Sequence, residues 1–231
     1  MASKLIIDPR FKVSIDPNSM QANPSMSVWN AMHTCVSSDA KRADTFATGF
    51  DPVQAVIKHA LKFGHWDVLH HASIKLDFFG FPHSTAMQFR THRQMSVLVQ
   101  SLRYSDEQFS ACADGDVDSQ DIFYFRPIAD KRKEALNYGR ARRSCVDYAK
   151  AIENGEDKET ARDNLLCNYR QGFTMSGTFC QWMHVLDRRL LADTQLEART
   201  AATMALDQLR GYSGFFEWYA ATRAGKNMLA P

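Results

Sequence analysis

The hydrophobic period of the chain changes at Gly64, and this change most limits the folds open to it. Residues 52–63 have the spacing of a helix, with Asp51 placed to cap its free N–H groups and Gly64 placed to end it. Residues 72–78 then alternate apolar and polar side chains, as in a strand with one face on a core. A helix followed so closely by such a strand favours a mixed α/β chain.

Other segments repeat this mixture of helices and strands. A second short strand is predicted for residues 85–89, and residues 169–176 are β-prone because of their aromatic and threonine content. Helices are predicted for three further segments: 130–153, 158–165 and, nearly without a break, 179–209. We therefore expect an α/β (α+β mixed) fold, with a central mixed β-sheet flanked by long helices.

Length and composition favour one domain spanning residues 1–231. Hydrophobic residues make up 45% of the chain and charged residues 23%, which is ordinary for a globular protein with a core. Neither an internal repeat nor a linker rich in glycine and proline divides the sequence. The net charge of +2 is small for a domain that binds nucleic acid, so we expect no nucleic-acid partner.

The cysteines and the N-terminal sequence favour a cytoplasmic protein. The five cysteines lie far apart and form no C-x-x-C pair, so neither a disulfide framework nor a metal site is expected. The first residues, MASKLIIDPRFKV, lack the apolar region of a signal peptide. A run of about 18 apolar residues is also missing, so we expect no membrane partner.

The stretch from Phe78 to Ser105 contains no acidic residue, yet it is rich in cationic and imidazole side chains: His83, Arg90, His92, Arg93 and Arg103. Arginine suits phosphate because its planar fork donates two parallel N–H groups, and Ser96 and Ser101 could add hydroxyl donors. Composition leaves two interpretations open. The arginines either form an anion site, or they are solvated or paired with distant acids.

Two further groups are ambiguous when taken alone. His65, His70 and His71 lie close together in the chain, but adjacent histidines in an extended segment point to opposite faces, and no metal-binding spacing accompanies them. Arg189, Gln195 and Glu197 lie among apolar residues of a predicted helix, where they are typical of an ordinary charged face. The sequence also lacks a nucleophile elbow, a Walker loop and a G-x-G-x-x-G turn.

Several blocks, in a fixed order between residues 64 and 199, resemble the signatures of the flavin-dependent thymidylate synthases, the ThyX family. Thr91-His92-Arg93, then seven residues and Ser101, is similar to the family's R-H-R-x7-S, and Gln88 matches a glutamine three positions earlier. The other blocks are Gly64-His65 with Leu69-His70-His71-Ala72 (G-H-x-x-x-x-E-H-A), Ala161-Arg162 with Leu165 (A-R-x-x-L-P), and Arg189 with Gln195 and Glu197 (R-x5-Q-x-E).

This resemblance implies the thymidylate synthase-complementing protein fold and the reductive methylation of dUMP to dTMP in de novo dTMP biosynthesis. The implied carbon donor is 5,10-methylenetetrahydrofolate, and the implied reductant is NADPH, acting through FAD without a metal. The resemblance also implies a homotetramer with active sites between subunits, in the cytoplasm of a bacterium or of a virus-infected host cell. The alternative is a catalytically impaired protein of the same fold that still binds dUMP or flavin.

The resemblance further implies a role for individual residues. Arg189 would stabilise the anionic form of the uracil ring beside its N3/O4 edge, which makes C5 a better nucleophile. Ser101 would position the substrate, and His65 would lie near the flavin. The implied dUMP set is Gln88, Val99, Gln100, Ser101, Leu102, Arg103, Arg162 and Arg189. The implied FAD set is Asp67, Thr91, His92, Arg93, Gln94, Thr178, Phe179, Cys180 and His184.

Some positions depart from the family pattern and indicate a divergent branch. Thr91 replaces the first arginine of the signature, His70 replaces a glutamate, and Leu166 replaces a proline. Common flavin contacts are replaced by Thr178, Cys180 and His184. Val99 replaces an acidic or amide residue of the dUMP set, and Gln100 lies one position after it. Because most departures fall in the FAD set, we expect FAD to be held differently while the dUMP contacts are kept.

Overall fold

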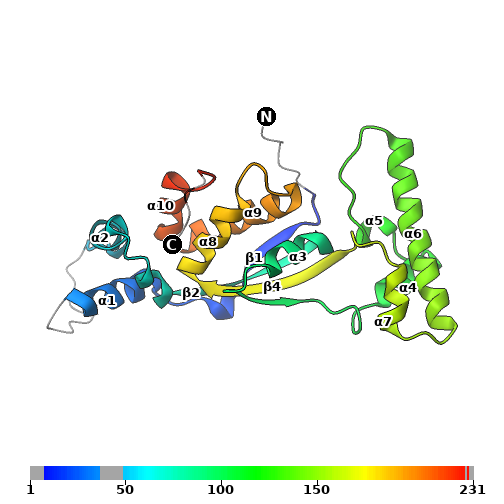
Figure 1. Ribbon diagram of the computed structural model, residues 1–231, viewed down its shortest axis with the longest axis horizontal. Helices are drawn as coiled ribbons and strands as arrows, with labels where there is room; N and C mark the ends of the chain where they lie inside the picture. The colour runs from blue at the N-terminus through cyan, green and yellow to red at the C-terminus, as the bar shows by residue number, and fades with distance from the viewer. Residues whose placement is uncertain (1–7, 37–48, 227, 229–231) are drawn as a thin grey trace.

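A computed structural model describes residues 8–36, 49–226 and 228 as an elongated molecule with a β-sheet in its middle (Figure 1). The four strands of the sheet are β1 (Lys12–Ile15), β2 (Ser73–Pro82), β3 (Ser96–Val99) and β4 (Arg170–Thr178), in the spatial order β1-β2-β4-β3. Each neighbouring pair is antiparallel. The expected fold class is confirmed, but this sheet is antiparallel where a mixed sheet was expected. The reason is that β4 is inserted between β2 and β3, which run in the same direction.

Helices cover one face of the sheet and lie at both of its ends (Figure 1). Along the covered face are α3 (His83–Arg90), α8 (Phe179–Arg189), α9 (Leu196–Tyr212) and α10 (Gly214–Thr222). At one end lie α1 (Pro24–Val36) and α2 (Pro52–His59), and at the other α4 (Glu107–Asp114), α5 (Ser119–Ile122), α6 (Lys131–Glu153) and α7 (Lys158–Ala161). Short 3-10 turns occupy Pro17–Ser19, Leu61–Phe63, Asp67–His71 and Arg162–Asn164.

The period-two pattern of residues 72–78 is confirmed in β2. Ile74, Leu76 and Phe78 are buried against the helices, since side chains along a strand alternate between its two faces. The opposite face of the sheet carries Phe79 and Leu98, which are 51% and 77% exposed. The alternation therefore identified the covered face of the sheet correctly.

Buried side chains form two hydrophobic clusters. The main cluster lies between the sheet and its helices and contains Phe78, Phe179 and Trp182. The second lies among α4, α5 and α6 and contains Phe109 and Tyr148. The long strands β2 and β4 both extend to this helical end of the molecule (Figure 1). A single domain for residues 1–231 stays a prediction.

Helix boundaries follow the capping residues closely. Asp51 accepts hydrogen bonds from the N–H groups of Val53 and Gln54 and starts α2 as expected. The helix predicted for 52–63 is shorter, since α2 ends at His59 and a 3-10 turn follows, which Gly64 ends with a φ of 83°. The predicted helix 130–153 is confirmed as α6, and the β-prone segment 169–176 is confirmed within β4. The predicted helix 158–165 is shorter, since α7 gives way to a 3-10 turn at Arg162.

Two predicted elements were wrong. Residues 85–89 form part of α3 and not a strand, because Thr85, Ala86 and Phe89 pack on the core at helical spacing, which outweighs their β propensity. The helix predicted for 179–209 breaks between Arg189 and Leu196. In this gap the Thr194 hydroxyl donates to the Arg188 carbonyl at 3.0 Å, a local bond that competes with the helical ladder.

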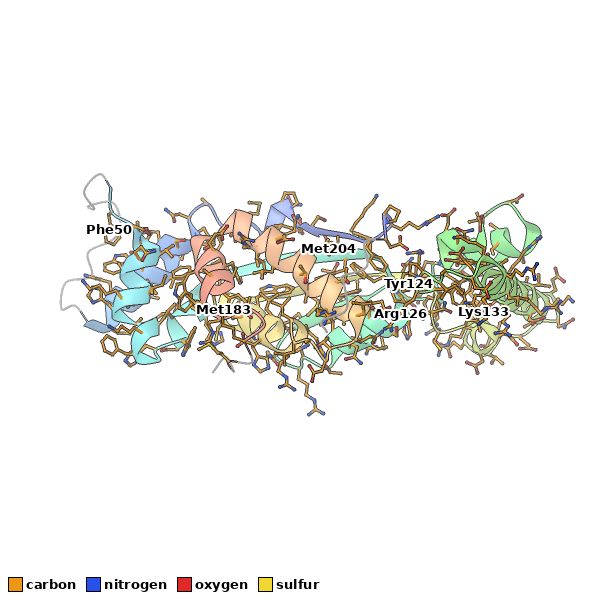
Figure 2. All side chains as sticks on the ribbon, turned by 90° about the horizontal axis from the view of Figure 1, so that it is seen from above. Phe50, Tyr124, Arg126, Lys133, Met183 and Met204 are labelled. Atoms are coloured by element: carbon orange, nitrogen blue, oxygen red, sulfur yellow. The ribbon has the colours of Figure 1, made fainter. Side chains whose placement is uncertain are left out.

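A buried carboxylate joins the sheet body to the helical end. Glu197, at the start of α9, is 3% exposed and accepts from Arg126 Nε at 2.5 Å and from Arg126 Nη2 at 2.9 Å. Figure 2 shows Tyr124 and Arg126 where the two parts meet, and the Tyr124 hydroxyl donates to Glu197 Oε1 at 3.4 Å. Burial acts to raise the pKa of Glu197, but the hydrogen bonds from Arg126 and Gln195 leave this pKa below its ordinary value.

We expect Arg126→Met to lower the free energy of unfolding by about 2 kcal/mol at pH 7, because it leaves a buried carboxylate without its charged donor. Urea denaturation measures this, with Arg132→Met on the exposed side of α6 as the control. The folded-state pKa of Glu197 is depressed, so its stabilising effect is present above the unfolded pKa and lost as pH falls through the folded one. The difference in the free energy of unfolding between Arg126→Met and wild type should therefore narrow as pH falls through the depressed pKa of Glu197. Equal stability of Arg126→Met and Arg132→Met at pH 7 would contradict this role.

Candidate functional site

The side chain of Arg189 joins the C-terminal end of α8 to that of α3. Its Nε donates to Nε2 of His92 at 2.9 Å, and its Nη1 donates to Oε1 of Gln88 at 2.9 Å. Its Nη2 donates to the carbonyl oxygen of Gln88 at 2.5 Å and to the hydroxyl of Thr91 at 2.8 Å. Arg189 and three residues at the end of α3 therefore form one hydrogen-bonded network, although the resemblance divided these four residues between the dUMP set and the FAD set.

Neutral atoms alone accept the hydrogen bonds of this arginine within the described residues. Burial lowers the pKa of Arg189, and the positive charge of the neighbouring Arg188 lowers it further. An arginine nevertheless stays protonated in proteins, because its pKa starts above 12. Arg189 is therefore a fixed, half-buried cation whose charge no described carboxylate neutralises.

His92 is a neutral histidine at neutral pH. Burial, followed by the positive charge of Arg189, lowers its pKa to about 4, and its side chain belongs to a residue only 6% exposed. Because its Nε2 accepts from Arg189, its proton lies on Nδ1. The ring of His184 lies edge-on to it, with the ring centroids 6.0 Å apart.

The Arg189 network forms one wall of a cavity of about 540 Å³. The end of α3, the end of α8 and the connection between α8 and α9 supply its lining: Gln88, Thr91, His92, His184, Arg188, Arg189, Leu191, Asp193, Thr194 and Gln195. No role was predicted from the sequence for Arg188, Leu191, Asp193 or Thr194. The Asp193-Thr194 pair, which disfavours a helix interior, was the signal that could have placed a break and a cavity there.

A smaller cavity of about 290 Å³ shares His184 with the first and is otherwise lined by His70, Gln94, Cys180 and Gln181. His70 Nδ1 lies 2.9 Å from the hydroxyl of Thr178, which caps the start of α8. The side-chain amide of Gln181 donates to the carbonyl of Gln94 at 2.6 Å. The structure thus brings together several residues of the predicted FAD set: Gln94, Thr178, Cys180 and His184.

Cys180 is a neutral thiol. Burial raises its pKa, and the negative charge of Asp67 adds to the effect, which also places Asp67 on this side of the site. A thiol of this kind packs as a small apolar group and is a poor nucleophile. Its contribution to the small cavity is therefore one of shape.

A third cavity, of about 590 Å³, holds most of the predicted dUMP set. Its lining includes Val99, Gln100, Ser101, Leu102 and Arg162, with His83, Met87 and Arg90 from α3. The carbonyl of Gln100 accepts from Nε2 of Gln171 at 2.5 Å, and Oε1 of Gln171 lies 2.7 Å from Nδ1 of His83. These bonds fix the start of the loop that carries Ser101.

Helix α3 separates this third cavity from the cavity of Arg189. His83, Met87 and Arg90 follow each other at helical spacing and line the Ser101 cavity. Gln88 and Thr91 lie on another face of the same helix and line the Arg189 cavity. The predicted dUMP residues of one chain therefore open on two different sides of α3.

Other predicted site residues lie outside these cavities. The side chain of Phe179 is fully buried in the main core, 4.9 Å from the ring of Phe216, and we leave it out of the site. Arg103 forms an exposed ion pair with Glu159 at 2.9 Å. His65 and Arg93 are both exposed, His65 before the 3-10 turn Asp67–His71 and Arg93 just after α3.

In residues 8–36, 49–226 and 228, three or more histidine, cysteine or acidic side chains are nowhere grouped so that they could hold a metal ion. Within the same residues, the helices are too short or too polar to cross a membrane.

Comparison with known proteins gives matches to one kind of enzyme. Residues 18–212 match the family model of the thymidylate synthase complementing proteins. The flavin-dependent thymidylate synthase of Halobacterium salinarum is 28% identical over 195 residues, which cover 76% of this chain and 79% of the relative. That of Haloarcula marismortui is 27% identical over 198 residues, with 77% and 80% covered.

A solved structure has a similar fold. The crystal structure of thymidylate synthase X from Helicobacter pylori with FAD and dUMP superimposes with a TM-score of 0.71 at 16% sequence identity. The superposition covers 90% of this chain and 97% of that one. At this identity the likeness concerns the fold.

We expect His92 to titrate with a midpoint near pH 4 and to be neutral at pH 6, because burial and Arg189 disfavour its charged form. The NMR chemical shifts of the His92 ring measure this against exposed His65. The folded pKa of His92 lies below its ordinary value of 6.5. His92 should therefore make the free energy of unfolding rise with pH between about 4 and 6.5, and this contribution is lost as pH falls through that window. A His92 midpoint near 6.5 would contradict the buried, Arg189-bonded state.

Proposed function

The chain belongs to the thymidylate synthase complementing protein family, and on that premise we propose that it is a flavin-dependent thymidylate synthase. It converts dUMP to dTMP with 5,10-methylenetetrahydrofolate as the carbon donor and with NADPH, acting through FAD, as the reductant. The observation that carries this proposal is Arg189, an unneutralised cation that two helices hold at a cavity within the matched residues 18–212. The names of the two archaeal relatives support the same activity.

The fixed position of Arg189 suits the chemical difficulty of the reaction. Uracil C5 is a weak nucleophile, and a cation at the N3/O4 edge stabilises the ring anion that is electron-rich at C5. A guanidinium has five N–H groups, and four hydrogen bonds to Gln88, Thr91 and His92 leave one for a ligand. Because its orientation is set in advance, Arg189 needs little reorganisation when charge develops on the substrate.

The residues around Arg189 fit FAD. The two cavities that share His184 combine arginine side chains, which suit a pyrophosphate, with imidazole rings and amides, which suit an isoalloxazine. Bound FAD supplies the route by which the reducing equivalents of NADPH reach the one-carbon unit. His92, Gln94, Cys180 and His184 would hold it.

We further propose that dUMP binds between subunits of a homotetramer. The separation of the dUMP set by α3 supports this, because Gln88 and Arg189 face one side and Ser101 and Arg162 face the other. A second subunit would bring its Ser101 cavity to the Arg189 cavity of the first. Arg162 would then bind the phosphate, while Ser101 and Gln100 position it. A cytoplasmic setting, without nucleic-acid or membrane partners, stays a prediction.

We expect purified wild-type protein to be yellow, to be bleached by NADPH without oxygen, and then to form dTMP from dUMP and methylenetetrahydrofolate. Arg189→Ala should lower kcat at least about a hundred-fold, because the ring anion loses its cation. Chromatographic dTMP detection measures this, with Arg140→Ala on the exposed face of α6 as the control. A wild type that forms no dTMP, or an Arg189→Ala variant near wild type in kcat/KM, would contradict the proposed function.

Mixed tetramers test where the two halves of the site come from. Arg189→Ala and Arg162→Ala, each inactive alone, should together recover about a quarter of wild-type activity when co-expressed, because a site between subunits draws each intact face from half of the chains. Arg189→Ala co-expressed with Gln88→Ala is the matched control and should recover nothing, since both changes damage the same face. No recovery in either mixture would place all of these residues in one subunit's site. Equal recovery in both mixtures would place them in separate sites.

A further inference from the structure

Arg188 is a second arginine at the Arg189 cavity, and the proposed reaction has so far given it no part. It lies near the C-terminal end of α8, it is exposed, and it lines the cavity beside Thr91, His92 and His184. Within the described part of the chain, the hydrogen bonds and ion pairs do not involve its guanidinium. Its donors are therefore free for a ligand.

The geometry of α8 directs this side chain toward the same ligand space as His184. The two residues are four positions apart, so they lie on one face of the helix, one turn from each other. The positive charge of Arg188 also lowers the pKa of His92 and of Arg189, which places its guanidinium in electrostatic reach of both. Asp193 is the one carboxylate in the lining; it is exposed and forms no ion pair with either arginine in the described residues.

Thr91 contributes no positive charge to this cavity. The family signature has an arginine at position 91, whereas the Thr91 hydroxyl accepts from Arg189 at 2.8 Å and donates to the carbonyl of Gln88 at 2.8 Å. An arginine has no acceptor atom, so it could not form the bond to Arg189. Position 91 thus orients Arg189 and offers no positive charge to an anion.

We propose that Arg188 is the phosphate-binding arginine of this cavity and supplies the anion contact that position 91 lacks. This inference rests on the proposed function, because that function brings phosphate esters to the site. The ligand group is a phosphate ester, either the pyrophosphate of FAD or the monophosphate of dUMP. An unpaired guanidinium matches it, because its planar fork donates two N–H groups to two oxygens.

Arg188→Ala and Arg188→Lys test the proposal, with Arg140→Ala as the control for loss of a distant exposed arginine. Two constants are measured on the full-length enzyme: the Kd for FAD from quenching of flavin fluorescence, and the KM for dUMP in the dTMP assay. Arg188→Ala should raise one of these two constants at least about ten-fold, and Arg188→Lys should give a value between those of Arg188→Ala and the wild type. Thermal unfolding should be unchanged, because the side chain is exposed.

The two constants distinguish the two sources of phosphate. A raised Kd for FAD with an unchanged KM for dUMP assigns Arg188 to the flavin pyrophosphate, and the reverse assigns it to the nucleotide. The rise of the affected constant in Arg188→Ala should be smaller at about 0.5 M salt, where a charge contact at an exposed residue is screened. A rise of the same size at low and high salt would overturn the proposal that Arg188 binds the phosphate through its charge.

Failure of this inference differs from failure of the proposed function. Both constants within about two-fold of wild type, in an enzyme that makes dTMP, would overturn the role of Arg188 and leave the function in place. A rise only in the KM for methylenetetrahydrofolate would overturn the phosphate assignment. A wild type that binds neither FAD nor dUMP would overturn the proposed function and this inference together.

Discussion

The bonds from Arg189 to α3 are the interaction on which the rest of the site depends. They tie the end of α8 to Gln88, Thr91 and His92, and they hold a cation among neutral acceptors. Burying a charge this far is costly unless its donors are satisfied, and four hydrogen bonds meet that condition without supplying a counter-charge. The network therefore stabilises the helix ends and keeps a positive charge available to a substrate. It also accounts for His92, which must stay neutral to accept a hydrogen bond from the arginine.

Helix α3 has a second consequence for function, because it presents a different cavity on each of its faces. Different positions along α3 line the two cavities: Gln88 and Thr91 line the Arg189 cavity, and His83, Met87 and Arg90 line the Ser101 cavity. In the proposed function, a ligand that needs both faces meets them from two chains. Strand β3, which leads to the Ser101 loop, is held at the edge of the sheet by its pairing with β4.

The sequence predicted correctly those features of the fold that depend on residues close together in the chain. The period of β2, the cap at Asp51 and the turn at Gly64 depend on neighbours in the chain and were correct. The α3 segment was misread because Thr85 and Phe89 suit a strand by propensity, and only packing against the distant strands β2 and β4 makes them helical. The family resemblance grouped Gln88, His92 and Arg189 as site residues, but their bonds, the cavity across α3 and the place of Arg188 depend on tertiary structure.

Positions 91 and 188 show how one divergence in a signature changes the chemistry of its neighbours. A threonine can both donate and accept, and Thr91 uses both capacities, toward Gln88 and Arg189. An arginine at the same point would turn an acceptor into a second cation beside a buried one, which weakens Arg189's hold on α3. An exposed residue such as Arg188 avoids that cost, since its charge is hydrated until a ligand arrives. Under the proposed roles, separating orientation from anion binding lets this cavity keep both a fixed cation for the pyrimidine and a free one for a phosphate.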